Sequence, residues 1–412
     1  MAESTFKKDG GISRRTFVAG TAAGLAAPMI VPRHVLGGPD QTPPSETLRG
    51  ALIGCGARGA ESWQRYFGPK VNMLAQCDVK FKDRADDKNF YTDFRRLLDR
   101  DDIDVVLIAT HPGWHALISI AAMEAGKDVV CEKPMCRFIS EGRAIADAEK
   151  RYGRIFQLER KGEFAPELPR KIFESGLLKT CDSVRVLKTA FKAKEWSGKV
   201  RYPISKVPAN LDWDMYCGPA PLRPFSIHRV GGTHRGYWDY EGGGLADMGQ
   251  HHLDKFAYDY GRDLTSPVEV VPHAPLAHPE ACGLWGWCEL KYADGFTLVL
   301  ESGEWGAPYD RLTQRGLTDK ELLMQLSEED RKKLNALPKP QEMPRFFEAV
   351  RTRQKPGGHA ERCHRVATIF HLANVAFRCG RPLKFDPVTE QIVGDEEANR
   401  LVNQPMRAPW RL

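Results

Sequence analysis

The sequence lacks the cysteine and histidine spacing of a metal centre or a disulfide framework. Its ten cysteines include no C-x-x-C pair, and no set of cysteines and histidines has the spacing of a zinc site. Cys131 and Cys136 are the closest pair in the sequence. We therefore expect thiols that pack as small apolar side chains, and no metal centre.

Positive charge is not concentrated in any part of the chain. The formal net charge is +6 over 412 residues, and the residues before position 41 supply two of these charges. The remaining charge is spread out, which argues against a nucleic-acid partner. There is no internal repeat. A composition of 42% hydrophobic and 28% charged residues is typical of a globular protein, and the length favours two domains.

An N-terminal apolar run long enough to cross a membrane is also missing. The stretch Phe17–Val31 is too short for a typical span, and it follows Ser13-Arg14-Arg15-Thr16. Two arginines before a weakly apolar stretch are typical of a twin-arginine export signal. We expect a periplasmic or otherwise exported protein that uses the twin-arginine machinery. Residues 1–45 would be signal and linker, and the mature chain would have no stable membrane span.

A glycine-rich turn follows the next short apolar run. Residues 48–59 read LRGALIGCGARG, which is G-x-G-x-x-G directly after a predicted strand. Such a turn leaves the strand sharply, lets the backbone approach a pyrophosphate, and lets the next helix pack close to the sheet. A second apolar run ends at Asp78, whose carboxylate would accept hydrogen bonds from the adenosine ribose. The candidate cofactor-binding residues here are Gly54, Gly56, Arg58, Gly59 and Asp78.

Short apolar strands alternate with helical patterns in the first part of the chain. Ile103–Ala109 and Val129–Cys131 are almost entirely apolar, as in strands buried on both faces of a parallel sheet. Trp114–Ala125 and Ile139–Tyr152 have the spacing of helices. This alternation predicts an α/β fold with a doubly wound parallel sheet, a Rossmann domain at residues 46–160.

Beyond residue 160 the pattern becomes that of an antiparallel sheet. Ser183–Thr189 alternates between apolar and polar residues, and Trp287–Tyr292 and Phe296–Leu300 flank Asp294-Gly295. Asp-Gly between two apolar runs is a strong hairpin signal. We therefore expect a second α/β domain at residues 161–412, with a mainly antiparallel sheet.

One group of residues that could carry chemistry is Glu132-Lys133-Pro134. It directly follows the predicted strand Val129–Cys131, so it lies at the carboxyl end of the sheet, where doubly wound folds bind their ligands. A lysine beside a positively charged nicotinamide ring would have a lowered pKa and could exchange a proton with a substrate hydroxyl. A surface lysine in a turn before proline is the alternative.

A second group lies between Asp247 and Asp254. On a helix Asp247 and His251 share a face, so the carboxylate could orient the imidazole. His252 is rotated by about 100° from His251 and would pack or contact substrate. A capping aspartate with a hydrogen-bonded histidine is the ordinary alternative, and no further ligand stands at metal spacing.

Taken together, four motifs resemble the glucose–fructose oxidoreductase, inositol dehydrogenase and MocA-like (Gfo/Idh/MocA) family. They are GCGARG with Asp78, ATHPGWH at residues 109–115, AGKDVVCEKP at 125–134, and GGGLADMGQHHLD at 242–254. The resemblance extends from about Leu48 to the end of the chain. It implies a Rossmann domain followed by an α/β domain with an open antiparallel sheet, which often forms oligomers, so we expect a homo-oligomer.

The resemblance also implies roles for particular residues. Lys133 would be the catalytic lysine, and Asp247 and His251 would be its partners across the cleft. Thr110, Glu132 and Lys133 itself would also contact the nucleotide. Because Asp78 would repel a 2′-phosphate, NAD is expected rather than NADP.

Two features depart from the family pattern. The separation between Lys133 and Asp247 is long, which predicts an inserted segment near the cleft that contains Trp213–Pro224. The residues Glu159-Arg160-Lys161 stand where relatives often have uncharged polar residues.

Arg235 and Trp238 are candidate substrate contacts, because guanidinium donors and aromatic faces suit sugars, and ordinary loop packing is the alternative.

The working hypothesis is reversible oxidation of a secondary hydroxyl on a sugar or polyol. His251, oriented by Asp247 and assisted by Lys133, would take the hydroxyl proton. Because there is no free NAD pool outside the cytoplasm to replace the reduced cofactor, an exported enzyme would hold its cofactor tightly between turnovers. The alternatives are an NAD-dependent enzyme that cleaves glycosides through transient oxidation, and a carbohydrate-binding protein without catalysis.

Overall fold

The computed structural model describes residues 47–84, 86–159, 161, 168–176, 184–310, 323, 324, 326–338 and 342–412. The expected export signal at Arg14 and Arg15 therefore lies outside the described residues. By its internal contacts the chain divides into Met1–Thr47 and Leu48–Leu412. The second unit contains both sheets.

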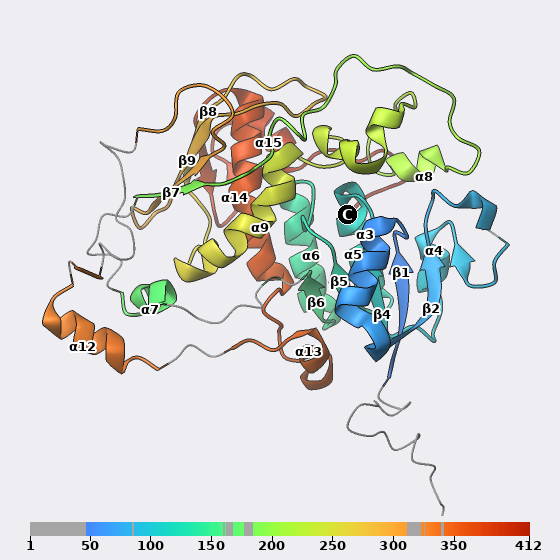
Figure 1. The fold of residues 1–412 in the computed structure, drawn as a ribbon, viewed down its shortest axis with the longest axis horizontal. Coiled ribbons are helices and arrows are strands. Elements are labelled where there is room, and N and C mark those ends of the chain that lie inside the picture. The colour runs from blue at the N-terminus through green and yellow to red at the C-terminus, as the bar shows by residue number, and fades with distance from the viewer. Residues whose placement is uncertain are drawn as a thin grey trace, which may run out of the picture. The chain divides into compact units, whose positions relative to one another are not determined.

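Six parallel strands form the first sheet, in the order β3-β2-β1-β4-β5-β6 (Figure 1). Their bounds are β1 Leu48–Ile53, β2 Val71–Cys77, β3 Phe90–Tyr91, β4 Val105–Ile108, β5 Asp128–Cys131 and β6 Phe156–Leu158. Every residue of β4 and β5 is buried, as expected for strands covered on both faces. This strand order is that of a Rossmann fold, which confirms the predicted doubly wound sheet.

Helices follow most strands of this sheet. They are α3 Ala57–Ser62, which continues as the π-helical turn η1 Trp63–Phe67, then α4 Phe94–Leu98, α5 His115–Glu124 and α6 Ile139–Tyr152, with short 3₁₀ turns at Gly68–Lys70, Lys82–Arg84 and Pro112–Trp114. The predicted bounds of α6 are confirmed, because Gly153 adopts the left-handed conformation that ends it. The helix expected near Gly59 begins earlier, at Ala57.

The second sheet has the order β12-β11-β8-β9-β10-β7. Its strands are β7 Val184–Lys188, β8 Glu269–His273, β9 Trp287–Lys291, β10 Thr297–Glu301, β11 Leu383–Asp386 and β12 Gln391–Ile392. All neighbours are antiparallel except β7 and β10. The β9–β10 hairpin turns at Gly295, where φ is +87°, so the predicted Asp-Gly hairpin is confirmed.

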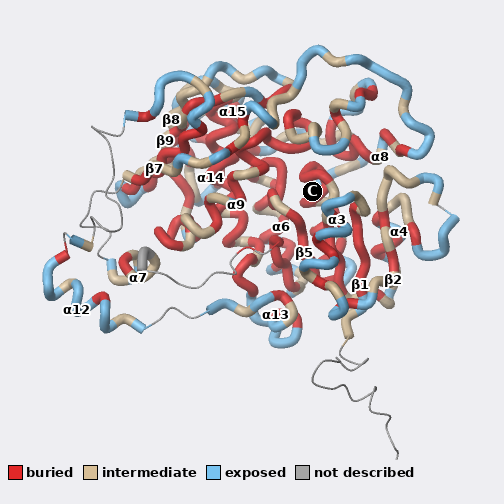
Figure 2. The backbone as a smooth tube through the Cα atoms, in the orientation of Figure 1, coloured by how far each residue is buried: buried red, intermediate tan, exposed pale blue. Residues whose placement is uncertain are grey.

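The second part of the chain contains several helices, of which α14, Ala360–Cys379, packs against elements of both parts. The helices of this part are α7 Leu168–Glu174, α8 Trp213–Cys217, α9 Gly243–Asp259, α12 Glu328–Ala336, α13 Phe346–Thr352, α14 Ala360–Cys379 and α15 Glu396–Val402, with 3₁₀ turns η6 Ile227–Arg229 and η7 Gly231–Gly236. Sixteen of the 20 residues of α14 are buried, and Figure 2 shows this helix as buried over most of its length. It packs against α6, α9 and β8. This packing holds α9 in place relative to the first sheet.

The segment that contains α8 contacts the loop that follows β2. The amide of Asp212 donates to the carbonyl of Val79, and the amide of Lys82 donates to the carbonyl of Asn210. Aromatic residues of the segment form their own small core, with Trp213, Tyr216, Phe225, Tyr237 and Tyr240 among its members. Among the described helices, none combines the length and the apolar character that a bilayer span requires.

Candidate active site

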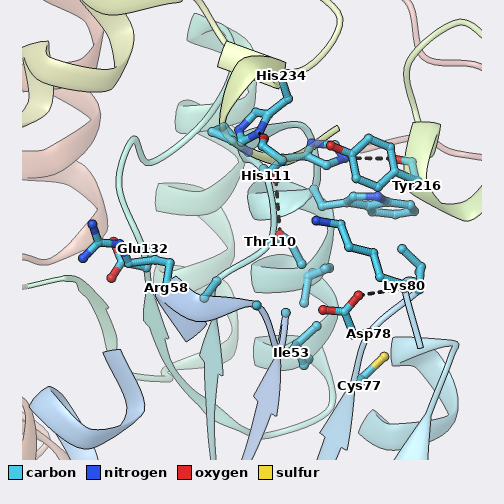
Figure 3. Close-up of a pocket in the computed structure, with 18 of the residues that line it drawn as sticks. Ile53, Arg58, Cys77, Asp78, Lys80, Thr110, His111, Glu132, Tyr216 and His234 are labelled. Carbon is cyan, nitrogen blue, oxygen red and sulfur yellow. Dashed lines mark hydrogen bonds between the residues drawn. The ribbon is translucent and has the colours of Figure 1, made fainter. Parts of the chain in front are cut away.

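A cavity of about 340 Å³ lies at the carboxyl ends of β1, β2, β4 and β5 (Figure 3). Seven of the eight predicted cofactor-binding residues line it: Gly54, Gly56, Arg58, Asp78, Thr110, Glu132 and Lys133. Tyr216 of α8 and His234 of η7 line the opposite side (Figure 3). The volume falls within the range of small-molecule sites.

The three glycines of the loop have three different environments. Gly54 has a φ of +94°, and a Cβ there would lie 2.5 Å from the carbonyl carbon of Ala109. A Cβ on Gly59, the eighth predicted residue, would lie 1.9 Å from the carbonyl oxygen of Gly54. A Cβ on Gly56 would meet nothing within 4 Å, so its backbone is open to a ligand. These are the tight turn, the close helix packing and the free approach that a dinucleotide loop requires.

Asp78 is held in a defined orientation at the end of β2. One carboxylate oxygen accepts from the amide of Cys55 at 2.7 Å, and the other accepts from the amide of Lys80 at 2.8 Å. Each oxygen has a second lone pair, so the side chain can still accept from ribose hydroxyls. The glycine loop, this carboxylate and the cavity between them fit a bound dinucleotide.

Lys133 and Asp247 form a buried ion pair between the end of β5 and α9. The Lys133 Nζ donates to Asp247 Oδ1 at 2.6 Å and to the Asp247 carbonyl oxygen at 3.0 Å. The two side chains are 10% and 7% exposed. Arg235 Nε donates to the same Oδ1 at 2.8 Å. Burial alone would raise the pKa of Asp247, but the charges of Lys133 and Arg235 outweigh it and lower this pKa to about 2.

Asp247 does not bond to His251 in the described structure, which corrects our expectation that it orients the imidazole. The Nδ1 of His251 instead lies 3.0 Å from Lys161 Nζ. Asp247 and His251 do share a helix face, but two charged donors reach Asp247, and charge-assisted hydrogen bonds are stronger than one from a neutral imidazole. Burial, followed by the charges of Lys161 and Lys133, lowers the pKa of His251.

The predicted substrate contacts separate in the structure. Arg235 lines the cavity. Trp238 is not among the described residues that line this cavity. It borders a second cavity of about 280 Å³, and its indole N–H donates to the His278 carbonyl at 2.9 Å. The ring of His252 packs against Phe191 and lies 3.3 Å from Thr189 Oγ1. Ordinary packing, the alternative considered for Trp238 and His252, describes both side chains.

Glu132 is buried beside the glycine loop. Its carboxylate accepts from the hydroxyl of Ser62 on α3. Burial, with a contribution from the charge of Glu159, raises the pKa of Glu132. Thr110 donates to the carbonyl of His111 at 3.2 Å. Both residues therefore shape the cavity wall from the ends of β4 and β5.

Sequence reasoning missed several residues of this region. His111 lies within the ATHPGWH motif, and its Nε2 is 2.8 Å from the Tyr216 carbonyl oxygen. Burial lowers the pKa of His111, so this imidazole is neutral. Tyr216 is another of these residues, and its ring lies under the ammonium of Lys80, at 5.6 Å from the ring centre. The sequence placed the segment around Trp213–Pro224 near the cleft, but no local signal singled out Tyr216 or His234, because only the tertiary fold shows which side chains reach the cavity.

No group of three or more His, Cys, Asp or Glu side chains within the described residues is arranged to hold a metal ion. Cys131 and Cys136 are buried, as expected of packed thiols. Burial raises the pKa of both thiols.

Two family models match the chain. Residues 48–160 match a model described as an oxidoreductase family with an NAD-binding Rossmann fold. Residues 166–412 match the C-terminal α/β domain of the same oxidoreductase family.

Individual relatives match over shorter stretches. A levoglucosan dehydrogenase of Pseudarthrobacter phenanthrenivorans is 35% identical over 120 residues, which are 29% of this chain and 30% of the relative. A glycosyl hydrolase family 109 protein of Solibacter usitatus is 33% identical over 142 residues, covering 30% of this chain and 32% of the relative. Each alignment thus spans about a third of the relative's own length.

The fold is also similar to that of solved structures. The WlbA dehydrogenase of Bordetella pertussis, in complex with NADH and UDP-GlcNAcA, superimposes with a TM-score of 0.51 at 14% identity. The match covers 82% of this chain and 99% of that protein. At this identity the similarity concerns the fold.

Proposed function

Because the chain belongs to the Gfo/Idh/MocA oxidoreductase family, we propose that it oxidises a secondary hydroxyl of a sugar, polyol or related carbohydrate with a nicotinamide dinucleotide. The observation that carries this proposal is the buried Lys133–Asp247 pair, 2.6 Å apart, beside a cavity lined by the glycine loop and Asp78. The relative named levoglucosan dehydrogenase supports a carbohydrate substrate.

We propose an orientation for the nucleotide from the residues present. The open backbone at Gly56 would receive the pyrophosphate, and Asp78 would bind the adenosine ribose. The nicotinamide would then lie toward Lys133, and when bound it supplies the hydride acceptor. A 2′-phosphate would face the Asp78 carboxylate, so we propose NAD as the cofactor, although Lys80 could offset part of that repulsion.

Lys133 is the group we propose for proton transfer. Lys133 is a charged ammonium in the ion pair, so it would first release a proton to solvent, and the uncharged amine would then accept the hydroxyl proton as the carbon-bound hydride leaves. The resulting ammonium would be stabilised by Asp247, which already accepts a hydrogen bond from it at 2.6 Å. Positioned acid–base groups of this kind contribute about 10²–10⁴ in rate.

The first experiment compares Lys133→Met with Lys150→Met, an exposed lysine on α6. Lys133→Met should retain NAD binding and lose about 10²–10⁴ in turnover with sugars or polyols. Lys150→Met should behave as wild type. Turnover of Lys133→Met near the wild-type rate would exclude Lys133 from the chemistry.

We further propose that the NAD stays bound between turnovers, as an exported enzyme requires. Contacts that hold α8 and the residue after it in place support this proposal. Trp114 Nε1 donates to the Met215 carbonyl at 3.0 Å, and Arg407 pairs with Asp214 at 2.7 Å. Arg407 also donates to the carbonyl of Gly218. Mass spectrometry of the purified protein should find NAD, and Arg407→Ala should accelerate its release. Protein that purifies free of nucleotide would contradict this point.

A second candidate function is glycoside cleavage through transient oxidation. The relative named glycosyl hydrolase family 109 protein favours it. Such an enzyme would oxidise a hydroxyl, release the aglycone after loss of the acidified neighbouring proton, and return the hydride to the product. Incubation with aryl glycosides without added NAD distinguishes the two functions. Release of the aryl group supports cleavage, whereas conversion of paired free sugars supports oxidoreduction. Tight sugar binding with neither reaction would indicate a binding protein.

A further inference from the structure

Lys161, Glu159 and His251 form a hydrogen-bonded cluster near the Lys133–Asp247 pair. Lys161 Nζ lies 2.8 Å from Glu159 Oε2 and 3.0 Å from His251 Nδ1. Tyr66 donates its hydroxyl to the other Glu159 oxygen at 2.9 Å. The side chains of Glu159 and Lys161 are each 9% exposed. Packing therefore determines where the ammonium of Lys161 lies.

The backbone that presents Lys161 is held in an unusual conformation. Glu159 has a φ of +37°, which is costly for a residue with a Cβ and persists only where the surroundings impose it. Gln157 Nε2 donates to the carbonyls of Glu159 and Lys161 at 2.8 and 3.0 Å. The amide of Glu159 donates to the Cys131 carbonyl at 2.7 Å. These bonds fix the turn after β6 next to the end of β5, from which Lys133 projects.

The contact with Lys161 determines which nitrogen of His251 carries a proton. An ammonium group has three donors and no acceptor, so Nδ1 must accept the hydrogen bond. The nearest carboxylate oxygen of Glu159 is 3.8 Å from Nδ1, too far for Nδ1–H to donate to it. A neutral imidazole with an accepting Nδ1 carries its proton on Nε2.

The charges around His251 also keep the imidazole neutral. Lys161 and Lys133 oppose its protonation, together with burial, and Glu159 and Asp247 favour protonation. The net effect lowers the pKa of His251. Near neutral pH the side chain therefore presents Nε2–H, which is a hydrogen-bond donor and cannot accept a proton.

We propose that Lys161 is a positioning residue that holds His251 as a hydrogen-bond donor to the substrate oxygen. His251 then stabilises the negative charge that develops on this oxygen while the proton passes to Lys133. This replaces the role of proton acceptor that the sequence suggested for His251. The substrate contact rests on the proposed function, whereas the protonation state assigned to His251 does not.

The protonation state can be measured by NMR of the full-length protein with ¹⁵N-labelled histidine. His251→Gln assigns the signal among the 12 histidines. We expect wild-type His251 to be neutral with its proton on Nε2 from about pH 5.5 to about pH 8. Lys161→Arg should retain this state, because arginine, like lysine, has hydrogen-bond donors and no acceptor. Lys161→Met should raise the pKa of His251 into this range, since Glu159 then acts on the imidazole with Lys133 as the one opposing cation that remains of the two. Lys150→Met is the control, because it removes the same charge from an exposed position.

A proton on Nδ1 of the wild-type protein, or a charged imidazole at pH 7, would overturn the assignment. The wild-type spectrum alone decides this, even if Lys161→Met does not fold.

Kinetics test the role in the reaction. Glutamine can place an amide N–H near the position of Nε2, but it cannot take up a proton. For a donor, His251→Leu should lose about 10²–10³ in turnover, and His251→Gln should stay within about tenfold of wild type. Equal losses in both variants would show that His251 accepts a proton and would overturn the proposal. If the wild-type protein oxidises no sugar, the proposed function fails, and the NMR measurement decides the assignment of Lys161 by itself.

Discussion

Replacing Asp247 by asparagine removes a buried charge on which two cations, Lys133 and Arg235, depend. Lys133 and Arg235 donate to the same oxygen, at 2.6 and 2.8 Å. Removing one partner of a buried ion pair costs about 3–5 kcal/mol, because the remaining charge is left unpaired. Lys133→Met should cost less, about 1–3 kcal/mol, since Asp247 keeps Arg235. We therefore expect Asp247→Asn to reduce the free energy of unfolding more than Lys133→Met.

The loss of stability in Asp247→Asn should depend on pH, because the pKa of Asp247 is lowered in the folded protein. A folded pKa of about 2, below the ordinary value, means that the carboxylate contributes stability above the unfolded pKa. This contribution is lost as the pH falls through the folded pKa. It amounts to about 2 kcal/mol at pH 7 and about half of that at pH 3.

Urea unfolding from about pH 3 to about pH 7 measures both effects. Asp87→Asn is the control, because this aspartate pairs with Arg84 at 2.9 Å but is 57% exposed. The control should change stability by about 0.5 kcal/mol or less. Equal destabilisation by Asp247→Asn and Lys133→Met would refute the shared-charge reasoning. A loss for Asp247→Asn that stays constant between pH 3 and pH 7 would do the same.

Three further predictions concern the glycine loop, the cofactor and export. Gly56→Ala should unfold like wild type but bind NAD more weakly, whereas Gly59→Ala should lower the unfolding temperature, because its Cβ would lie 1.9 Å from a carbonyl oxygen; equal thermal stability of the two variants would contradict this. Asp78→Asn should improve binding of NADP relative to NAD by roughly 10- to 150-fold, the equivalent of about 1.5–3 kcal/mol, as measured by calorimetric titration, and an unchanged ratio would remove Asp78 from cofactor selection. Replacing Arg14 and Arg15 by lysine should leave the protein in the cytoplasm, as judged by fractionation, and unchanged export would exclude the twin-arginine route.

Local sequence patterns predicted the first sheet and much of its ligand loop. The spacing of Gly54, Gly56 and Gly59 after an apolar run predicted a tight turn. The structure shows why glycine is needed there, because a Cβ on Gly54 or Gly59 would clash with backbone atoms. The helix Ile139–Tyr152 was predicted with the bounds observed, because Gly153 is a local stop signal. The Asp-Gly hairpin is equally local. In each case neighbouring residues carry the information.

The partners within the candidate site could not be predicted in this way. Helix spacing correctly placed Asp247 and His251 on one face of α9, but it could not show which groups meet that face. Lys133 lies 114 residues from Asp247, and Lys161 lies 90 residues from His251. The pairing depends on where α14 and the turn after β6 hold these elements.

By itself, the sequence determined the doubly wound fold, the glycine loop and the shared helix face of Asp247 and His251, because each depends on contacts along a few neighbouring residues. Only the tertiary structure decided that Asp247 pairs with two cations and that His251 accepts from Lys161. The physical reason is competition: several donors reach the same face of α9, and distance, burial and charge select among them.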